Sequence, residues 1–485
     1  MTEEQTEEQS VIVNGKFGKI LVVNAYAGTG KSYTLKQYCL SRPNKRIIYF
    51  VYGSSNKIDA LKSFAGLKNV VIVTFHGLAY KLLGIKYKNR LEHDLTPIDF
   101  KKYLINTIDE SRVLIASSLL FNMIVEFCQS DMDIDNFLIY LNKNRVNYGL
   151  KYKIQVIDII RMFPSVWNDL ISSDDMPISH DIYLKLFQLS CPTLDYDDIL
   201  IDEAQDLNAC MLSIVYNQNS KRVYVGDMFQ SIFTWRGAVN SIQQLSLLEE
   251  AKVVYLSKSF RCSPYIAEIA NNVIRKAGAE KDFIGIGGTK PIEIHTPAII
   301  ARTNGKLINF CVDAILDENA KIYFVGGVKN YNLKELLDIK YLMSKRHDFI
   351  KNKFYKQFEN IKELKAYADE IEDIGLKSLI GIVLKHSKED AKIGLHELIK
   401  LIKESATASI KEADYIVTTA HKSKGLEWDN VVLLDDFIEC SKVSYPDQKE
   451  KEELYLLYVA ITRAKHNIEF RDGGMAEWVK MQLRP

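Results

Sequence analysis

Residues 25–32, Ala-Tyr-Ala-Gly-Thr-Gly-Lys-Ser, have the types and spacing of a phosphate-binding loop. The apolar run 19–24 precedes them and a helical pattern follows, which is the strand–loop–helix context that such a loop requires. Bare glycines let successive backbone N–H groups point at phosphate oxygens, and the helix N-terminus adds positive potential. Lys31 would reach the β- and γ-phosphates, and the Ser32 hydroxyl would ligate Mg²⁺. Ala25 replaces the first glycine of the general pattern, so a plain glycine-rich turn remains the alternative at this point.

Two adjacent carboxylates, Asp202 and Glu203, end the apolar run 199–201. Neighbouring carboxylates at a strand end are costly unless a cation or a proton-transfer role accounts for them. Asp202 suits Mg²⁺, directly or through water, and Glu203 suits the base that activates an attacking water. An acidic strand end is a weak signal by itself, and it gains weight downstream of a phosphate loop.

Alternating strand and helix patterns must position these groups. Apolar, β-branched runs at 19–24, 46–52, 70–74, 199–202 and 222–226 indicate buried strands of a parallel sheet. A second cycle starts near residue 253, with strand patterns at 298–302, 321–325, 415–418 and 431–434. Residues 85–179 and 332–413 are helical in pattern, so each α/β unit is expected to carry a helical insertion.

Composition narrows the class of protein. The 485 residues are too many for one core, and 63 basic against 62 acidic residues give a net charge of +1. A nucleic-acid groove would therefore need local segregation of charge. The seven cysteines form no C-x-x-C pair, which argues against zinc or iron–sulfur ligation. The acidic N-terminus is unlike a signal peptide, and no apolar run is expected to be long enough for a membrane span, so we expect a cytoplasmic protein without a membrane partner.

The order of the remaining motifs carries a family resemblance. The chain resembles the UvrD-like superfamily-one helicases, in which DEAQD is motif two and GDMFQSIFTWRGA is motif three. The other blocks follow in the expected order, namely residues 6–9 (Q-motif), 74–76 (Ib), 256–261 (four), 301–304 (the next strand motif), 418–428 (five) and 453–465 (six). The likeness spans residues 9–465, and it implies two RecA-like motor domains of the P-loop NTPase fold.

Within that group the chain is most similar to the F-box DNA helicases. Residues 179–186 (SHDIYLKL), 259–261 and 74–80 follow their pattern. The chain begins eight residues before Gln9, so we expect no F-box and no role in ubiquitin ligation. Gly53-Ser54 stands where the family has an Asn-Lys pair, Tyr33 replaces an arginine beside adenine, and Trp428 replaces a phenylalanine.

The resemblance implies the following boundaries. Motor domain 1A comprises residues 1–84 and 186–248, with insertion 1B at 85–185. Motor domain 2A comprises residues 249–330 and 414–485, with the small insertion 2B at 331–413.

The resemblance also implies a site for ATP and Mg²⁺. The implied catalytic residues are Lys31, Asp202, Glu203, Gln230, Arg261 and Arg463, with Ser32 and Asp202 on the metal. Gln230 would sense the γ-phosphate, and the two arginines would act as fingers from the second motor domain, where a planar guanidinium meets developing charge well. The implied nucleotide contacts are Gln9, Ala27, Gly28, Thr29, Gly30, Lys31, Ser32, Phe260 and Glu427.

The implied contacts to single-stranded DNA are Thr74, His76, Phe233, Trp235, Arg236, Arg302, Asn304, Thr418 and His421. Aromatic side chains stack on any base, which suits a sequence-independent track. A core role for Phe233 and a structural role for His76 remain open alternatives, whereas His180 and Tyr183 are expected to be structural.

The resulting expectation is a monomeric 3′→5′ translocase and helicase that unwinds duplex DNA in replication, repair or recombination. It would act at single-strand/duplex junctions, and recombinase or replication proteins would be further partners. The polarity comes from the resemblance of residues 230–237 alone. Two alternatives stay open. One is a translocase that strips recombinase filaments, which the small insertion 2B keeps open, and the other is a nucleotide-gated binding module without catalysis, which the intact catalytic set opposes. RNA as the track is not excluded by any residue.

Overall fold

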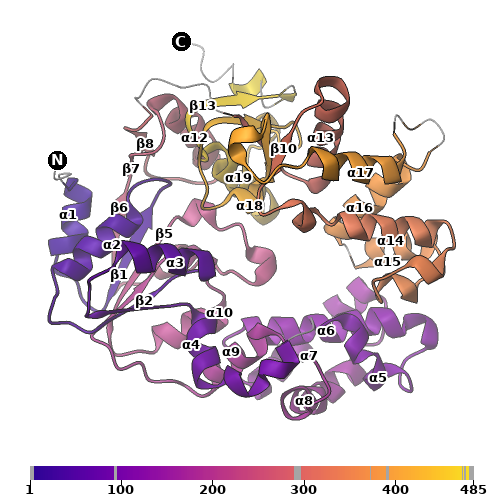
Figure 1. The fold of residues 1–485 in the computed structure, drawn as a ribbon. Helices are drawn as coiled ribbons and strands as arrows, with labels where there is room; N and C mark the ends of the chain where they lie inside the picture. Colours follow the sequence, from indigo (N-terminus) through magenta and orange to yellow (C-terminus); the bar gives the residue numbers. More distant parts are fainter. Residues whose placement is uncertain are drawn as a thin grey trace. The chain divides into compact units, whose positions relative to one another are not determined.

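A computed structural model describes residues 5–91, 95–288, 296–371, 373–388, 391, 393–471, 473–474 and 477–479. The chain divides into two compact units, Met1–Ser257 and Lys258–Pro485. Each unit contains one large parallel sheet with helices around it (Figure 1).

The sheet of the first unit has six parallel strands in the order β3-β2-β4-β5-β1-β6. All six residues of β1 and all four of β2 and β4 are buried, as expected for strands covered on both faces. Leu21, Val23, Leu200 and Val223 pack with Leu35 of α2 in one apolar core. The strands are β1 (Ile20–Ala25), β2 (Ile47–Phe50), β3 (Val70–Val73), β4 (Asp198–Ile201), β5 (Lys221–Gly226) and β6 (Ala251–Leu256).

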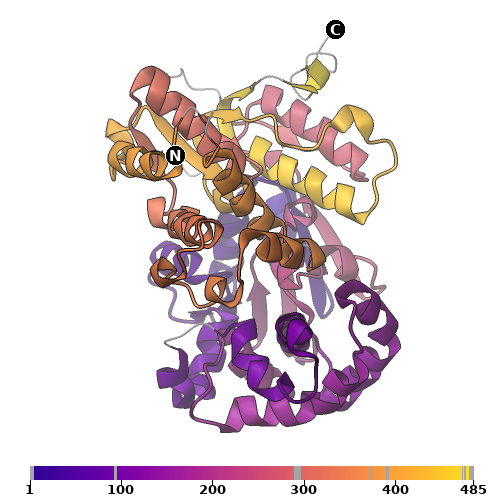
Figure 2. The ribbon, with the colours of Figure 1, turned by 90° about the vertical axis from the view of Figure 1, so that its right-hand side faces the viewer.

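Helices of the first unit fall into two groups. Those near the sheet are α1 (Glu7–Asn14), α2 (Lys31–Leu40), α3 (Ser54–Ser63), α4 (Phe75–Leu82), α9 (His180–Leu189), α10 (Ala209–Tyr216) and α11 (Ser241–Leu245). Figure 2 shows the others gathered in purple away from the strands, as the predicted insertion requires. They are α5 (Lys101–Leu104), α6 (Val113–Gln129), α7 (Ile134–Tyr152) and α8 (Ile157–Ser172).

One apolar helical stretch differs from the expectation that no run is long enough for a membrane. Among the described residues, Glu110–Gln129 is long and apolar enough to cross a membrane by length and composition. Its apolar window is 61% buried inside the protein, where Phe127 packs against Phe137, Phe163 and Trp167. A search for an uninterrupted apolar run overlooks this stretch because Ser117, Ser118, Asn122 and Glu126 interrupt it. The burial is that of a core helix of the insertion.

The second unit has a five-stranded parallel sheet in the order β10-β11-β9-β12-β13 and a separate two-stranded β7-β8 pair. Its strands are β7 (Lys258–Ser259), β8 (Ile284–Gly285), β9 (Ala298–Ala301), β10 (Ile322–Phe324), β11 (Tyr415–Thr419), β12 (Trp428–Leu433) and β13 (Ala464–Phe470). Its sheet-side helices are α12 (Pro264–Lys276), α13 (Asn304–Glu318), α18 (Ala420–Ser423) and α19 (Gln448–Ile461). The insertion comprises α14 (Leu333–Met343), α15 (Ile361–Glu370), α16 (Ile374–Lys385) and α17 (Leu395–Ser405).

The fold class predicted from the sequence is therefore confirmed, and one boundary moves. The sequence assigned residues 249–256 to the second motor domain, because a new strand pattern begins there. β6 instead pairs in parallel with β1 as the sixth strand of the first sheet. The first unit accordingly ends at Ser257.

Candidate active site and nucleic-acid interface

Five strand ends of the first unit carry chemistry at one edge of the sheet. The phosphate-loop candidate follows β1, Asp202 and Glu203 follow β4, and Asp227 follows β5. Tyr52 follows β2, and Thr74 follows β3. Because carboxyl ends of parallel strands share an edge, the topology gathers these groups where α/β proteins bind ligands.

The loop between β1 and α2 has the backbone of a phosphate cradle. Gly28 and Gly30 have φ of 70° and 79°, a region that side chains disfavour, and Gly30 directly precedes α2. The Thr29 hydroxyl donates to the carbonyl of Tyr26 at 2.8 Å, which fixes the loop. Four consecutive residues, from the buried Ala27 to Gly30, thus lead into a helix N-terminus with Lys31 as its first residue.

Lys31 faces the carboxylate pair. Its Nζ lies 3.3 Å from Glu203 Oε1, with the two side chains only 14% and 20% exposed. Burial opposes its charge, but Glu203, Asp227 and Asp202 outweigh that effect and raise the pKa of Lys31, so the ammonium persists. Glu203 has φ of 51°, an uncommon left-handed conformation for a glutamate. Such strain concentrates at functional sites, and here it aims the carboxylate at the phosphate loop.

Asp202 fits the magnesium role predicted for it. Its Oδ2 accepts from the Tyr49 hydroxyl at 2.7 Å and its Oδ1 from the Glu203 N–H at 3.0 Å, which orients the carboxylate. Burial and the neighbouring Glu203 raise its pKa to about 6. The Asp202 carboxylate and the hydroxyl of the exposed Ser32 are oxygen ligands of the kind that bind Mg²⁺ together with substrate phosphates.

A polar chain connects Glu203 to the predicted γ-phosphate sensor. Gln205 Nε2 donates to Glu203 Oε2 at 2.6 Å, and Gln205 Oε1 accepts from the Asp227 N–H at 3.1 Å. Gln230 Nε2 donates to Asp227 Oδ2 at 2.8 Å. The three residues Gln205, Asp227 and Gln230 are each at most 4% exposed, so the chain is shielded from water.

An aromatic cluster follows directly after this chain. Phe233 is partly exposed and stacks on Tyr52 at 6.2 Å between centroids, with 14° between the rings. Trp235 is 65% exposed and meets Phe233 edge-on, and the Arg236 guanidinium lies 4.7 Å from the Trp235 ring. The predicted stacking residues are thus surface groups backed by a cation, and Phe233 is not a core residue.

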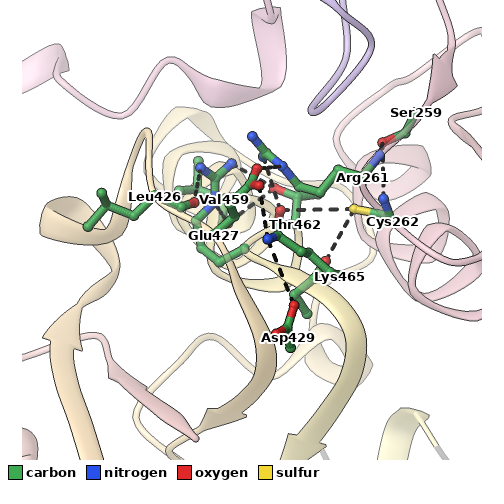
Figure 3. A network of polar contacts seen from close by, with 11 residues as sticks. Ser259, Arg261, Cys262, Leu426, Glu427, Asp429, Val459, Thr462 and Lys465 are labelled. Carbon is green, nitrogen blue, oxygen red and sulfur yellow. Dashed lines mark hydrogen bonds and ion pairs between the residues drawn. The ribbon is translucent and has the colours of Figure 1, made fainter. Parts of the chain in front are cut away.

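Arg261 in the second unit is held by a carboxylate. Its Nε donates to Glu427 Oε2 at 2.6 Å and its Nη1 to the Thr462 carbonyl at 3.3 Å. Lys465 Nζ lies 3.2 Å from Glu427 Oε1, so two cations share Glu427 (Figure 3). Burial opposes ionisation of Glu427, but Arg261 and Lys465 outweigh it and lower its pKa. Phe260, predicted to stack on adenine, is 50% exposed beside this network.

Arg463, the other predicted finger, is 1% exposed. Its Nε donates to the Val459 carbonyl at 2.8 Å, its Nη1 to the Leu426 carbonyl at 3.0 Å and its Nη2 to Thr462 Oγ1 at 3.1 Å. A phosphate contact would therefore require the guanidinium to exchange these carbonyls for phosphate oxygens. Arg261 and Arg463 both contact Thr462 and lie near the amino ends of β12 and β13.

Comparison with known proteins agrees with this geometry. The family described as UvrD/REP helicase N-terminal domain matches residues 192–249, and the UvrD-like helicase C-terminal domain matches residues 327–470. F-box DNA helicase 1 of Gallus gallus is 28% identical over 95% of this chain and 48% of its own length. F-box DNA helicase protein 1 of Schizosaccharomyces pombe is 28% identical over 96% of this chain and 57% of its own.

The chain is thus similar to UvrD-like helicases in both matched segments and, at 28% identity, over nearly its whole length. It spans about half the length of the F-box relatives it matches. ATP-dependent DNA helicase PcrA of Staphylococcus aureus is also similar, with 24% identity over 68% of this chain and 52% of the relative.

Two sequence blocks that resemble those of F-box DNA helicases meet in space. His76 Nε2 lies 2.9 Å from Asp181 Oδ1, which joins the start of α4 to the start of α9. His180 Nδ1 lies 2.9 Å from the Tyr183 hydroxyl, and Tyr183 contacts the Tyr80 ring at 5.7 Å. His180 and Tyr183 are therefore structural, as the sequence suggested. His76 is both an anchor of α9 and 35% exposed, so its predicted DNA contact stays a prediction.

Thr74 acts through its side chain as the cap of α4. Its hydroxyl accepts from the Gly77 N–H at 2.9 Å. A contact between Thr74 and DNA stays a prediction.

The other predicted DNA contacts lie at the carboxyl edge of the second sheet. Arg302 forms a bidentate pair with Glu453 at 2.8 and 2.7 Å, and Asn304 Oδ1 is buried with no hydrogen-bond partner among the described residues. His421 is partly exposed in α18. The prediction for Thr418 needs correction, because its side chain is 0% exposed and donates to the Thr419 carbonyl at 3.3 Å. Thr418 is a buried residue of β11.

Gln9 of the predicted Q-motif is placed against the phosphate loop. Its Nε2 donates to the Thr29 carbonyl at 3.3 Å, and its Oε1 accepts from the Thr6 N–H at 3.0 Å in a capping box. The neighbouring Glu8 carboxylate accepts from the N–H and the hydroxyl of Ser257 at 2.7 and 2.8 Å. α1 therefore connects the phosphate loop to the last residue of the first unit.

Sequence reasoning missed Tyr52 and Gln205. Tyr52 immediately follows the β2 pattern, and an aromatic residue at the carboxyl end of a parallel strand was the available signal. Gln205 lies inside the DEAQD block, and only the structure shows that its amide spans from Glu203 to Asp227.

Proposed function

We propose that this chain is an ATP-dependent DNA helicase, a DNA-stimulated ATP hydrolase that moves 3′→5′ along single-stranded DNA and unwinds duplex DNA in replication, repair or recombination. The observation that carries the proposal is the 3.3 Å pairing of Lys31 with a strained Glu203 at the carboxyl edge of a parallel sheet. The relatives named as DNA helicases support the choice of DNA as track.

The geometry suggests how the first unit prepares hydrolysis. The Lys31 ammonium pairs with the Glu203 carboxylate at 3.3 Å. A bound triphosphate offers Lys31 a stronger anionic partner, which leaves Glu203 to accept a proton from the attacking water. That water attacks the γ-phosphorus as the bond to the ADP oxygen breaks. Mg²⁺, held by Ser32 and Asp202, would neutralise charge on the phosphate oxygens.

Arg261 and Arg463 would stabilise charge on the transferred phosphoryl group. Their guanidiniums keep their protons and match planar phosphate edges. In the present structure Glu427 and main-chain carbonyls occupy them, so their engagement would accompany nucleotide binding. Through its hydrogen bond to Asp227, Gln230 would transmit the presence of the γ-phosphate to residues 233–236, here called the aromatic loop.

The polarity rests on the likeness of residues 230–237 to UvrD-type helicases. It is tested by strand displacement on duplexes with either a 3′ or a 5′ overhang, using the wild type and Lys31→Ala. Unwinding from the 3′ overhang alone, lost in the variant, is expected. Unwinding only from the 5′ overhang would overturn the polarity, and equal activity in the variant would overturn the motor. If recombinase filaments are removed while no duplex is unwound, the translocase alternative takes its place.

A further inference from the structure

The side-chain amide of Gln205 hydrogen-bonds to Glu203 through its nitrogen and to Asp227 through its oxygen. Its Nε2 donates to the Glu203 carboxylate at 2.6 Å, and its Oε1 accepts from the Asp227 N–H at 3.1 Å. The residue is 0% exposed, so neither bond competes with water. Only a side chain with both a donor and an acceptor at its tip makes this bridge, and glutamine has both.

Gly226 carries an independent sign that this bridge is built into the fold. A Cβ at position 226 would lie 2.1 Å from Gln205 Oε1, a distance that no real Cβ contact shows. Gly226 is not among the glycines with a positive φ, so its backbone conformation does not require glycine. The absence of a side chain at 226 therefore makes room for the Gln205 amide.

The far end of the bridge is a rigid turn that leads into the aromatic loop. Asp227 accepts from Gln230 Nε2 at 2.8 Å and from the Phe229 N–H at 3.0 Å. The Ser231 hydroxyl donates to the Gln205 carbonyl at 3.1 Å. Phe233, two residues further on, stacks on Tyr52. A shift of the aromatic loop thus has a short path of buried hydrogen bonds back to Glu203.

We propose that Gln205 is the positioning residue that couples single-stranded DNA on the Phe233–Trp235 loop to the placement of Glu203. The inference rests on the proposed function, because it assumes a DNA-stimulated ATPase. DNA bound at the loop moves or stiffens the 227–231 turn, and Gln205 transmits this to Glu203 through its two bonds. Coupling of this kind acts in both directions, so nucleotide changes DNA affinity by the factor with which DNA changes nucleotide affinity.

Gln205→Met is the principal test, because methionine keeps the length and volume of the side chain and removes both bonds. Wild type and variant are compared by ATP hydrolysis with and without single-stranded DNA. The variant is expected to lose far more of the DNA-stimulated rate than of the basal rate, so that stimulation by DNA falls toward onefold. A purely structural Gln205 would instead lower basal and stimulated rates by the same factor. That result, or unchanged stimulation, would overturn the inference.

Gly226→Ala tests the same bridge from the opposite side. The new Cβ displaces Gln205 Oε1, so the variant is expected to lose stimulation as Gln205→Met does. In a Gln205→Ala background the Gln205 amide is gone, and the new Cβ still lies 3.1 Å from the Ala204 backbone nitrogen, so Gly226→Ala is expected to add less loss than it causes in the wild type. Gly18→Ala is the matched control, because nothing lies within 4 Å of its added Cβ. Normal stimulation in Gly226→Ala, or full additivity in the double variant, would contradict the bridge.

A binding measurement separates this inference from the proposed function. Affinity for single-stranded DNA is measured with and without a non-hydrolysable ATP analogue. Gln205→Met is expected to bind DNA like the wild type without nucleotide, and to lose the change that the analogue causes. If the wild type lacks DNA-stimulated hydrolysis, the proposed function itself fails. If the wild type is stimulated and Gln205→Met keeps both stimulation and the analogue effect, only the role of Gln205 fails.

Should Gln205→Met not fold, Gln205→Glu replaces it. This variant keeps an acceptor for the Asp227 N–H but repels Glu203, so it is expected to lose stimulation as well.

Discussion

Replacing Lys185 with methionine tests how the insertion of the first unit is joined to its sheet-side helices. Lys185 of α9 is 0% exposed, and its Nζ donates to the carbonyls of Ser130 and Met132 at 2.8 and 2.6 Å. It also donates to Gln188 Oε1 at 2.8 Å and lies 4.5 Å from the Phe127 ring centre. The ammonium therefore joins α9 to the segment between α6 and α7.

The expected loss follows from these contacts. Methionine keeps the apolar stem but leaves two main-chain carbonyls without their donor, at about 1–3 kcal/mol each. Relief from burying a charge offsets part of that loss. We therefore expect Lys185→Met to lower the free energy of unfolding by about 1–3 kcal/mol in urea denaturation at pH 7. Lys143→Met, on an exposed position of α7, is the control and is expected to change it by less than about 0.5 kcal/mol.

The pH dependence of the same variant gives a second readout. Burial lowers the pKa of Lys185 from its usual 10.5. Between the folded pKa and 10.5 the unfolded chain binds more protons, so this group makes the wild type more stable as pH rises through that window. Methionine has no such proton, and the stability difference between wild type and variant should widen toward pH 10.5. A variant as stable as the wild type, or a difference that narrows with pH, would refute the reasoning.

Three further changes test the DNA and nucleotide sites. Trp235→Ala should weaken binding of single-stranded DNA by about 1–3 kcal/mol in fluorescence anisotropy, and unchanged affinity would remove Trp235 from the track. Glu427→Ala should lower kcat for ATP more than Glu427→Gln does, because the glutamine oxygen still accepts from Arg261 Nε, and equal effects would argue against that support. Asp181→Asn should weaken DNA binding although it removes a negative charge, because Asp181 orients His76, and tighter binding would show that the carboxylate only repels DNA.

Candidate site residues were predictable from the sequence where they form one contiguous motif. The phosphate-loop and Asp202-Glu203 predictions each depend on neighbouring residues and on a preceding strand, and the structure has a strand at both places. The fold class was predictable for the same reason, because buried parallel strands leave uninterrupted apolar runs. The boundary near residue 249 was not, since a strand pattern does not reveal which sheet the strand joins.

Side-chain partners across the fold were not predictable. Thr418 has a motif position typical of a DNA contact, but the side of β11 that it occupies depends on how the sheet is covered. Arg463 was expected to act as an arginine finger, yet carbonyls from two segments satisfy its guanidinium in the interior. The His76–Asp181 pair joins residues 105 positions apart, a separation at which sequence patterns specify no partner.

The central claim is that Glu203 is the base of a DNA-stimulated ATPase. The most direct test measures ATP hydrolysis by the wild type and by Glu203→Gln, each with and without single-stranded DNA. The wild type should hydrolyse ATP and be stimulated by DNA, because Glu203 is aimed at the phosphate loop and linked to the aromatic loop. Glu203→Gln should still bind an ATP analogue with Mg²⁺, since the loop and Lys31 remain, but should lose hydrolysis with and without DNA. Hydrolysis at the wild-type rate in Glu203→Gln, or a wild type that DNA does not stimulate, would contradict the account.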